Sequence, residues 1–516
     1  MEPYNNSYSH TVPLFIKIFC SIFMWSPIII PFISIWYFPT ITIIYSIMVS
    51  LYVIVTSLLL HATSMFTCIK QKRIIHKFFN RSEWINIPEN DKILHIVIIP
   101  VYKEDPMVLE QTLISLAEQN VSMFIGLALE EREPNSHIKY HHLVEKYENQ
   151  FLKILPTIHP NNLPNETPGK ASNSNYSIQI LIKYYEKYLQ DSYPYVMITS
   201  CDCDSIWCEN YYSYLNYLCI KNDLKYFNNV VYTPNITNLR NFTLHHMVSN
   251  WMSLVRSIGT HGHFRRLGST RCFTSEYHIP LELIKRIDYW DADLVHEDVH
   301  MRNKLAILDE KFLSFEHTYL PCDNQTPTSS HSAYESFVLL WNQSLRWNLF
   351  IYDIYYLVHM LLLNISKKKC YENFRSDSWK IVKEIINNYD NLFYFFIIPV
   401  ANNLFWMIYL HLFDNQPYEH LTYFLLNYIQ PTFIIIQMLL AIFQCIFMLN
   451  INDVTTQSKF YSEKEYILFV IGSIPFPFFV VIYQGINITI AWIHTLKSSH
   501  SHSESAIKMV TNPKDK

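Results

Sequence analysis

Glycine is scarce in this chain: only seven glycines occur among 516 residues. Neither G-x-G-x-x-G nor G-x-x-x-x-G-K-[ST] is present, which argues against a Rossmann dinucleotide site and a P-loop. Any bound nucleotide must therefore be held by side chains and a metal. Charged residues are also scarce, at 16% against a usual quarter. A net charge of −4 and the lack of a basic stripe predict that nucleic acid is not a partner.

The ten cysteines have no spacing typical of a metal site. Cys203 could ligate zinc in principle, but no Cys/His pair lies near it in the sequence, and zinc needs about four such ligands. Reduced, structural cysteines in a cytosolic domain are the expected reading.

Apolar residues make up half of the chain and concentrate in long runs at its two ends. The runs 13–38 and 40–62 are each long enough to span a bilayer, and Pro39 between them predicts a helical hairpin. The first run is too long for a signal peptide and lacks a basic start and a cleavage site. Basic residues after the hairpin place the hydrophilic middle in the cytosol; they are Lys70, Lys72, Arg73, Lys77 and Arg81.

Three further apolar runs, 392–413, 421–449 and 466–493, are predicted to span the membrane. An odd number of C-terminal spans puts the tail outside, yet that tail contains lysines. Three explanations stay open: the tail breaks the positive-inside rule, the segment at Pro475 and Pro477 re-enters, or residues 349–365 also enter the bilayer. Four polar residues in these runs either line a path through the helices or bond helix to helix: Asn402, Asn403, Gln437 and Gln444.

The hydrophilic middle reads as strands alternating with helices. The β-branched runs 93–100, 124–129 and 195–199 predict buried strands, with helices starting near Pro106 and Lys170 between them. This order is typical of an α/β sheet. Residues 135–165 are predicted to be irregular, and strand 230–233 and helices over 241–266, 297–305 and 335–365 are expected to follow.

Two carboxylates, Asp202 and Asp204, come directly after the strand 195–199. Ligands of α/β sheets bind outside the carboxyl ends of the strands. Because Mg²⁺ prefers one or two carboxylates plus substrate phosphates, the pair predicts a metal–diphosphate site. A solvated acidic turn is the alternative reading of so short a motif.

The order of motifs resembles the processive family-2 glycosyltransferases, which are the cellulose, chitin and hyaluronan synthases. The resemblance covers roughly residues 93–350 and is carried by the following motifs: Ile99-Pro100-Val101-Tyr102-Lys103-Glu104, acidic residues after the second strand, Gly169-Lys170-Ala171-Ser172-Asn173, Asp202-x-Asp204, Glu297-Asp298 and Gln343-x-x-Arg346-Trp347.

The resemblance implies an α/β GT-A nucleotide-sugar-binding domain, with a mixed, mainly parallel sheet and helices on both faces, inserted between transmembrane α-helices. The implied domains are a transmembrane hairpin (1–65), a cytosolic basic linker (66–92), the GT-A catalytic domain (93–332), interfacial amphipathic helices (333–390), C-terminal transmembrane helices (391–495) and a polar tail (496–516). The chain would then be a multi-pass membrane protein with a cytosolic catalytic domain.

The resemblance also implies roles for individual residues. Asp202 and Asp204 would hold Mg²⁺ or Mn²⁺ and the nucleotide diphosphate. Asp298 would be the general base, with Glu297 beside it. The other implied contacts are Glu130 or Glu131 to the base of the nucleotide, where the family has an aspartate, Lys170 near the nucleotide, Arg346 at the pyrophosphate and Trp347 at the acceptor sugar. Gln343 of the same motif is implied to bind substrate.

Each of these residues also has a plain structural reading. Glu297 and Asp298 suit the positive end of a helix dipole. Arg346 could reach phosphate headgroups, and Trp347 could be an interfacial anchor.

The function implied is inverting sugar transfer from a UDP-sugar to a growing β-linked polysaccharide, coupled to export through the membrane helices. The expected partners are the donor, a polysaccharide or lipid-linked acceptor and membrane lipids. A non-processive transferase using a lipid-linked or glycolipid acceptor is the alternative. A transporter is disfavoured, because the spans are split by a large soluble insert and show no repeat.

Overall fold

The computed structural model describes residues 12–79, 92–238, 240, 249, 253, 256–257, 275–308, 313–327, 332–366, 378–393, 405, 408, 435, 439 and 476–497. The polar residues predicted within the C-terminal spans lie outside this set, as do nearly all of the runs 392–413 and 421–449. Most of the helix predicted over 241–266 lies outside it too.

Within the described residues, eight strands form one sheet in the order β3-β2-β1-β4-β7-β6-β8-β5. The pairs β1–β2, β1–β4, β2–β3 and β6–β8 are parallel, whereas β4–β7, β6–β7 and β5–β8 are antiparallel. The sheet is therefore mixed and mostly parallel, as predicted. The strands are β1 (Ile93–Pro100), β2 (Met123–Glu130), β3 (Lys153–His159), β4 (Tyr195–Ser200), β5 (Ile206–Trp207), β6 (Val230–Thr237), β7 (Tyr277–Pro280) and β8 (Ser314–Asp323).

Helices cover both faces of this sheet, as predicted. One face packs against α3 (Pro106–Ala117), α4 (Ser136–Tyr147) and α6 (Tyr211–Lys221), and the other against α5 (Lys170–Tyr188), α8 (Leu281–Arg286) and α9 (Glu297–Ile307). A short 3-10 helix, η3 (Leu224–Asn229), leads into β6. Strands β1 and β2 read as continuous apolar runs because both of their faces are buried. Gly126 allows α5 to approach β2 closely, since a Cβ there would collide with the side chain of Leu181.

The prediction that 135–165 is irregular was wrong, because this segment contains α4 and β3. Tyr140, Leu143 and Tyr147 recur at helical spacing and are buried against the sheet. Strand β3 is at the sheet edge and buries only Ile154, Thr157 and His159, two of which are polar, so it has no apolar pattern. The polar composition of the segment hid both elements.

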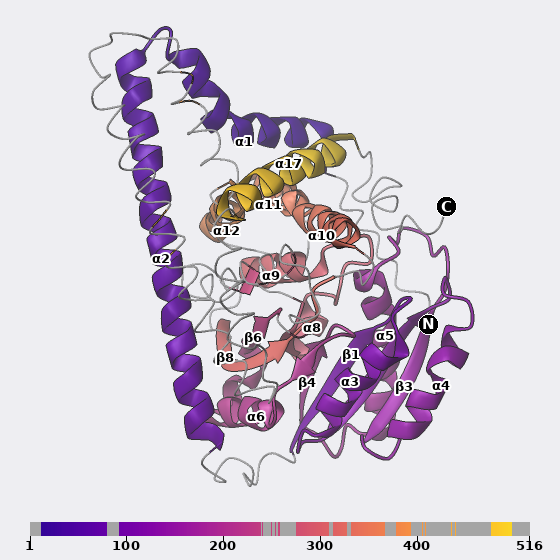
Figure 1. Cartoon of the computed structure of the whole chain (residues 1–516). Helices are drawn as coiled ribbons and strands as arrows, with labels where there is room; N and C mark the ends of the chain where they lie inside the picture. The colour runs from indigo at the N-terminus through magenta and orange to yellow at the C-terminus, as the bar shows by residue number, and fades with distance from the viewer. Residues whose placement is uncertain are drawn as a thin grey trace.

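Helix α1 (Leu14–Ser34) contains Pro27 and Pro31 and is followed by α2 (Pro39–Phe79). The linker expected over 66–92 is thus helical as far as Phe79. The C-terminal part of α2 is attached to the sheet: Asn235 of β6 donates to Gln71, and the Lys70 ammonium lies 3.8 Å from the ring centroid of Tyr319. Figure 1 shows α2 running along one side of the molecule from the sheet to α1.

Helices α10 (Ala333–Asn348), α11 (Ile351–Ile365), α12 (Ser378–Phe393) and α17 (Phe476–Lys497) gather with α1 beyond the sheet, and α9 lies between this group and the sheet (Figure 1). Polar contacts join the group: Lys17 donates to the Tyr352 hydroxyl at 2.8 Å, and Asn348 donates to Asn487 at 2.7 Å. Among the described residues, two helical stretches, Pro39–His76 and Ala333–Ile365, are long and apolar enough to cross a membrane.

Candidate functional site

The Asp202–Asp204 loop leaves the carboxyl end of β4, next to β1 at the centre of the sheet. The Asp204 carboxylate accepts from the backbone N–H of Gln325 at 3.1 Å, and Arg240 donates to its backbone carbonyl. Burial and the neighbouring carboxylate of Asp202 raise the pKa of Asp204 to about 7. The loop is thus a fixed structure with more negative charge than its surroundings neutralise.

Lys170 connects this loop to a distant part of the chain. It is the first residue of α5, directly after Gly169. Its ammonium lies 2.7 Å from Asp202 Oδ1 and 2.8 Å from Glu297 Oε1, and it donates to the Ser275 carbonyl at 3.1 Å. Burial lowers the pKa of Lys170, but the two carboxylates outweigh this and hold it well above its usual range. Lys170 is therefore a permanent cation shared by two acidic groups.

The first turn of α9 supplies Glu297 and Asp298. Glu297 is buried and points to Lys170, whereas Asp298 is half-buried and accepts from the Val299 N–H at 2.7 Å. Burial and the adjacent Glu297 charge raise the pKa of Asp298 to about 7. A carboxyl group with such a pKa can accept a proton near neutral pH, as a general base must.

Helix α10 carries Gln343, Arg346 and Trp347 on its last turns. The charge of Arg346 interacts with those of Asp202 and Glu297, so the helix end faces the same acidic region. Trp347 keeps 44% of its surface exposed. The Arg256 guanidinium lies 3.8 Å from the Trp347 ring centroid and donates to Gln343 at 3.0 Å. The indole thus offers a partly exposed apolar face beside the charged site.

Glu130 and Glu131 lie at the end of β2, and the structure distinguishes them. Glu130 is buried and ion-paired with Arg132, whose guanidinium carbon lies 4.6 Å from the ring centroid of Tyr102. Glu131 is exposed and accepts from the Asn161 N–H at 2.8 Å. The structure brings Asp202, Lys170, Glu297 and Arg346 together, and it places the Glu130–Arg132 pair at the end of β2, which β1 separates from β4.

Two acidic residues of this region were not assigned a role from the sequence. Glu104 follows β1, and its charge interacts with those of Asp202 and Arg346. Glu276 is fully buried and accepts from Ser205 at 2.5 Å and from Asn324 at 2.9 Å; burial and Asp202 raise its pKa to about 8. Glu104 belonged to a quoted motif, whereas no sequence pattern singled out Glu276.

Among the described residues, no three His, Cys, Asp or Glu side chains are arranged as a complete metal site. Asp202 and Asp204 nevertheless suit a divalent cation that shares its coordination with substrate phosphates. Burial is the main cause of the raised pKa values of Glu104, Asp204 and Glu276, and the charge of Asp202 raises each of them further. A bound cation would offset both effects by stabilising the ionised carboxylates, so the residues fit Mg²⁺ or Mn²⁺.

Comparisons with known proteins gave a match among solved structures only. No protein-family model matches it, and a search of curated proteins found no match. One solved structure that it resembles is the mannosyltransferase PcManGT from Pyrobaculum calidifontis in complex with GDP-Man and Mn2+. The similarity covers 76% of this chain and 98% of that chain, with a TM-score of 0.37 and 12% sequence identity. So distant a likeness carries no argument about the function of this chain.

Proposed function

We propose that this protein is an inverting glycosyltransferase that transfers a sugar from a UDP-sugar to a carbohydrate acceptor at a membrane. The observation that carries the proposal is the position of Lys170, 2.7 Å from Asp202 and 2.8 Å from Glu297. The Lys170 ammonium thereby joins two segments. One is the acidic loop of Asp202 and Asp204, which suits a metal–diphosphate, and the other is the first turn of α9, which suits a general base. Arg346 brings a second cation to the same place.

The chemistry requires these groups in these roles. Inverting transfer needs a base that removes the acceptor hydroxyl proton as the anomeric carbon is attacked, and Asp298 is suited to this role. Such a base contributes about 10²–10⁴-fold to the rate. The leaving nucleoside diphosphate gains negative charge, which Lys170 and Arg346 would stabilise. A divalent cation held by Asp202 and Asp204 would supply further charge neutralisation.

Recognition of the two substrates would fall to the flanking residues. Glu130, buried at the end of β2 next to Arg132, is better placed than the exposed Glu131 to be fixed against a nucleobase. Trp347 would line the acceptor site, because a flat apolar indole face packs against the C–H face of a pyranose.

The proposed function includes export of the product across the membrane. The two apolar helices, together with the apolar C-terminal runs, would embed the protein in a bilayer and let a β-linked polysaccharide leave beside its site of synthesis. A chain of sugars cannot cross hydrocarbon unaided, so an enzyme that exports its polymer would need such helices. A single-sugar product on a lipid would instead identify a non-processive transferase.

The test is UDP release by the full-length protein in membranes, measured donor by donor with Mg²⁺, with Mn²⁺ and with chelator. We expect metal-dependent release with one UDP-sugar and its loss in Asp298→Asn. Sizing of the product then separates polymer from single addition. No release from any UDP-sugar would overturn the proposal.

A further inference from the structure

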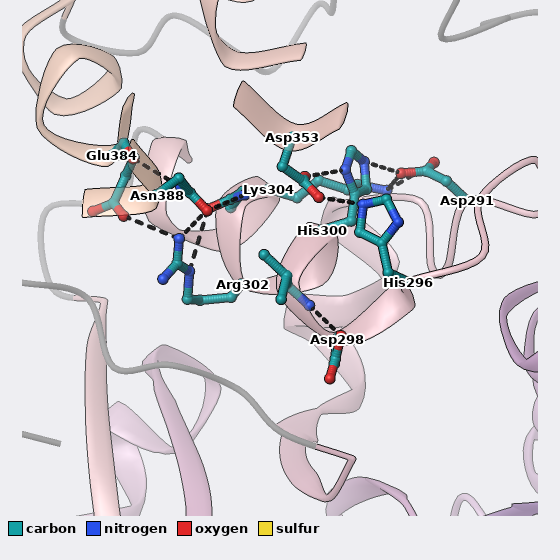
Figure 2. Close-up of polar contacts among 11 residues, drawn as sticks. Asp291, His296, Asp298, His300, Arg302, Lys304, Asp353, Glu384 and Asn388 are labelled. Carbon is teal, nitrogen blue, oxygen red and sulfur yellow. Dashed lines mark hydrogen bonds and ion pairs between the residues drawn. The ribbon is translucent and has the colours of Figure 1, made fainter. Parts of the chain in front are cut away.

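A buried row of charged side chains joins α9 to α11, outside the residues considered so far. Asp353 of α11 is fully buried and contacts two histidines: His296 through Nε2 and His300 through Nδ1, the latter at 2.7 Å. The other ring nitrogen of His300 lies 2.8 Å from Asp291, and Asp291 is 3.0 Å from the Lys304 ammonium. Figure 2 shows these side chains converging from both helices.

The row is charged at neutral pH. Burial lowers the pKa of His300, but the carboxylates of Asp353 and Asp291 outweigh it and raise that pKa to about 9. Besides these carboxylates, His300 faces His296 and Lys304 of its own segment and the ring of Tyr356 of α11, at 4.7 Å between centroids. The Arg302–Glu384 pair lies elsewhere on the helix, between α9 and α12 (Figure 2).

Stability alone does not explain such a row. Replacing a buried ion pair by apolar side chains of similar volume is often neutral or stabilising. What the ionic arrangement adds is a single permitted geometry, because each buried charge must keep its partner. The row therefore fixes α9 and α11 relative to each other in position and rotation.

Two members of the row lie close in the sequence to the residues proposed to perform the reaction. His296 is the residue before Glu297 and the N-cap of α9. Asp353 comes six residues after Trp347, on the helix that continues from α10. Asp298 and Asp353 lie on opposite sides of the first turn of α9 (Figure 2). The row thus contacts the first turn of α9 on the side opposite to Asp298.

We propose that Asp353, acting through His296 and His300, is a positioning residue that sets Asp298 relative to the acceptor side of the site at Trp347. This inference rests on the proposed function. Asp353 touches neither substrate nor metal ligand. Its loss would move the base with respect to the acceptor hydroxyl and leave the donor site in place.

The experiment compares three variants of the full-length protein in membranes: Asp353→Asn, His300→Gln and, as a matched control, Glu384→Gln. The control removes a buried carboxylate that also holds α9, through Arg302 at 3.6 Å, but belongs to α12 instead of α11. UDP release gives kcat and the donor KM as functions of pH, and protection from thermal unfolding by UDP with Mn²⁺ reports the donor site.

We expect Asp353→Asn to lower kcat by about 100-fold, the usual effect of misplacing a catalytic group by roughly 1 Å. The donor KM and the protection by UDP should stay unchanged. In the wild type kcat should fall as the pH rises through about 9, because His300 then loses its proton and the Asp353 and Asp291 carboxylates repel each other. Asp353→Asn should shift this fall to lower pH, and His300→Gln should abolish it.

Glu384→Gln should keep the wild-type kcat and pH profile. The inference is overturned if Asp353→Asn and His300→Gln behave like this control, or if both lose UDP protection, which would make the row a general element of stability. An inactive wild type would instead overturn the proposed function, and this inference with it.

Discussion

The ammonium of Lys170 lies 2.8 Å from the carboxylate of Glu297, and these residues are the first of their helices, α5 and α9. Two helix starts on the same face of the sheet thus meet through an ion pair. Because Lys170 also contacts Asp202, the Asp202–Asp204 loop and the Glu297–Asp298 turn share one counter-charge. A substitution in the loop is therefore expected to affect the turn, and a substitution in the turn is expected to affect the loop.

The first prediction concerns this shared charge. Lys170→Met leaves the carboxylates of Asp202 and Glu297 facing each other, with Arg346 as the remaining cation. We expect the metal-free protein to lose about 3–5 kcal/mol of stability, as when a buried pair loses one member. Mn²⁺ should restore part of the loss by supplying positive charge at Asp202. Thermal unfolding with and without Mn²⁺ measures both effects.

The control for this variant is Lys285→Met, which removes a surface pair with the half-exposed Glu186. Its effect should stay within about 0.5 kcal/mol and should not depend on metal. Equal losses in the two variants would contradict a special role for Lys170.

The second prediction concerns the metal ligands. Asp204→Asn removes one of the two carboxylates suited to the cation, and we expect Mn²⁺-dependent UDP affinity to fall by about 100-fold. Calorimetric titration of UDP into protein saturated with Mn²⁺ measures this. Asp223→Asn, an exposed aspartate ion-paired with Lys225, should bind UDP as the wild type does. Unchanged binding by Asp204→Asn would remove it from the metal site.

The third prediction concerns pH. Asp298 works as a base only when ionised, so kcat should rise with pH through about 7. Glu297→Gln removes a neighbouring negative charge, which favours the ionised form of Asp298 and lowers its pKa. The rise in kcat should therefore shift to lower pH by roughly one unit. UDP release is measured from pH 5 to 8, which is about the range of the rise, and shows the direction of the shift in Glu297→Gln. A shift to higher pH would exclude Asp298 as the base.

The fourth prediction concerns the acceptor. Trp347→Ala removes the exposed indole, and we expect extension of an added acceptor to fall by about tenfold, the value of one good aromatic contact. UDP affinity should stay unchanged, because the indole lies at the end of α10 and not in the acidic loop. Trp347→Phe should retain most of the extension. A loss of UDP binding in Trp347→Ala would place the residue on the donor side.

Much of the fold follows from the sequence because the central strands are buried on both faces. Strands β1, β2 and β4 had to be continuous apolar runs, and such runs are visible without a structure. Four strands escaped prediction: β3, β5, β7 and β8. The edge strand β3 buries fewer residues, β5 and β7 are too short to carry a pattern, and polar residues interrupt the sequence of β8.

The residues of the candidate site also divide into those that the sequence indicated and those that it did not. Asp202, Asp204, Glu297, Asp298, Arg346 and Trp347 were indicated by motifs, each readable within a few residues of chain. Glu276 and Asp353 were not, because their importance comes from partners that are distant in the sequence. A buried carboxylate is recognisable only once the groups that surround it are known.

Helix α2 contains 41 residues, which at the rise of an α-helix is about 60 Å. Hydrocarbon of a bilayer is only about half as thick. If its N-terminal half spans the bilayer, the remainder is a rigid helical segment outside it. Gln71 attaches this segment to β6, and Lys70 attaches it to β8. The sheet would then be held at a fixed height and tilt above the lipid. Activity would in that case depend on bilayer thickness, which measurements in bilayers of different thickness could detect.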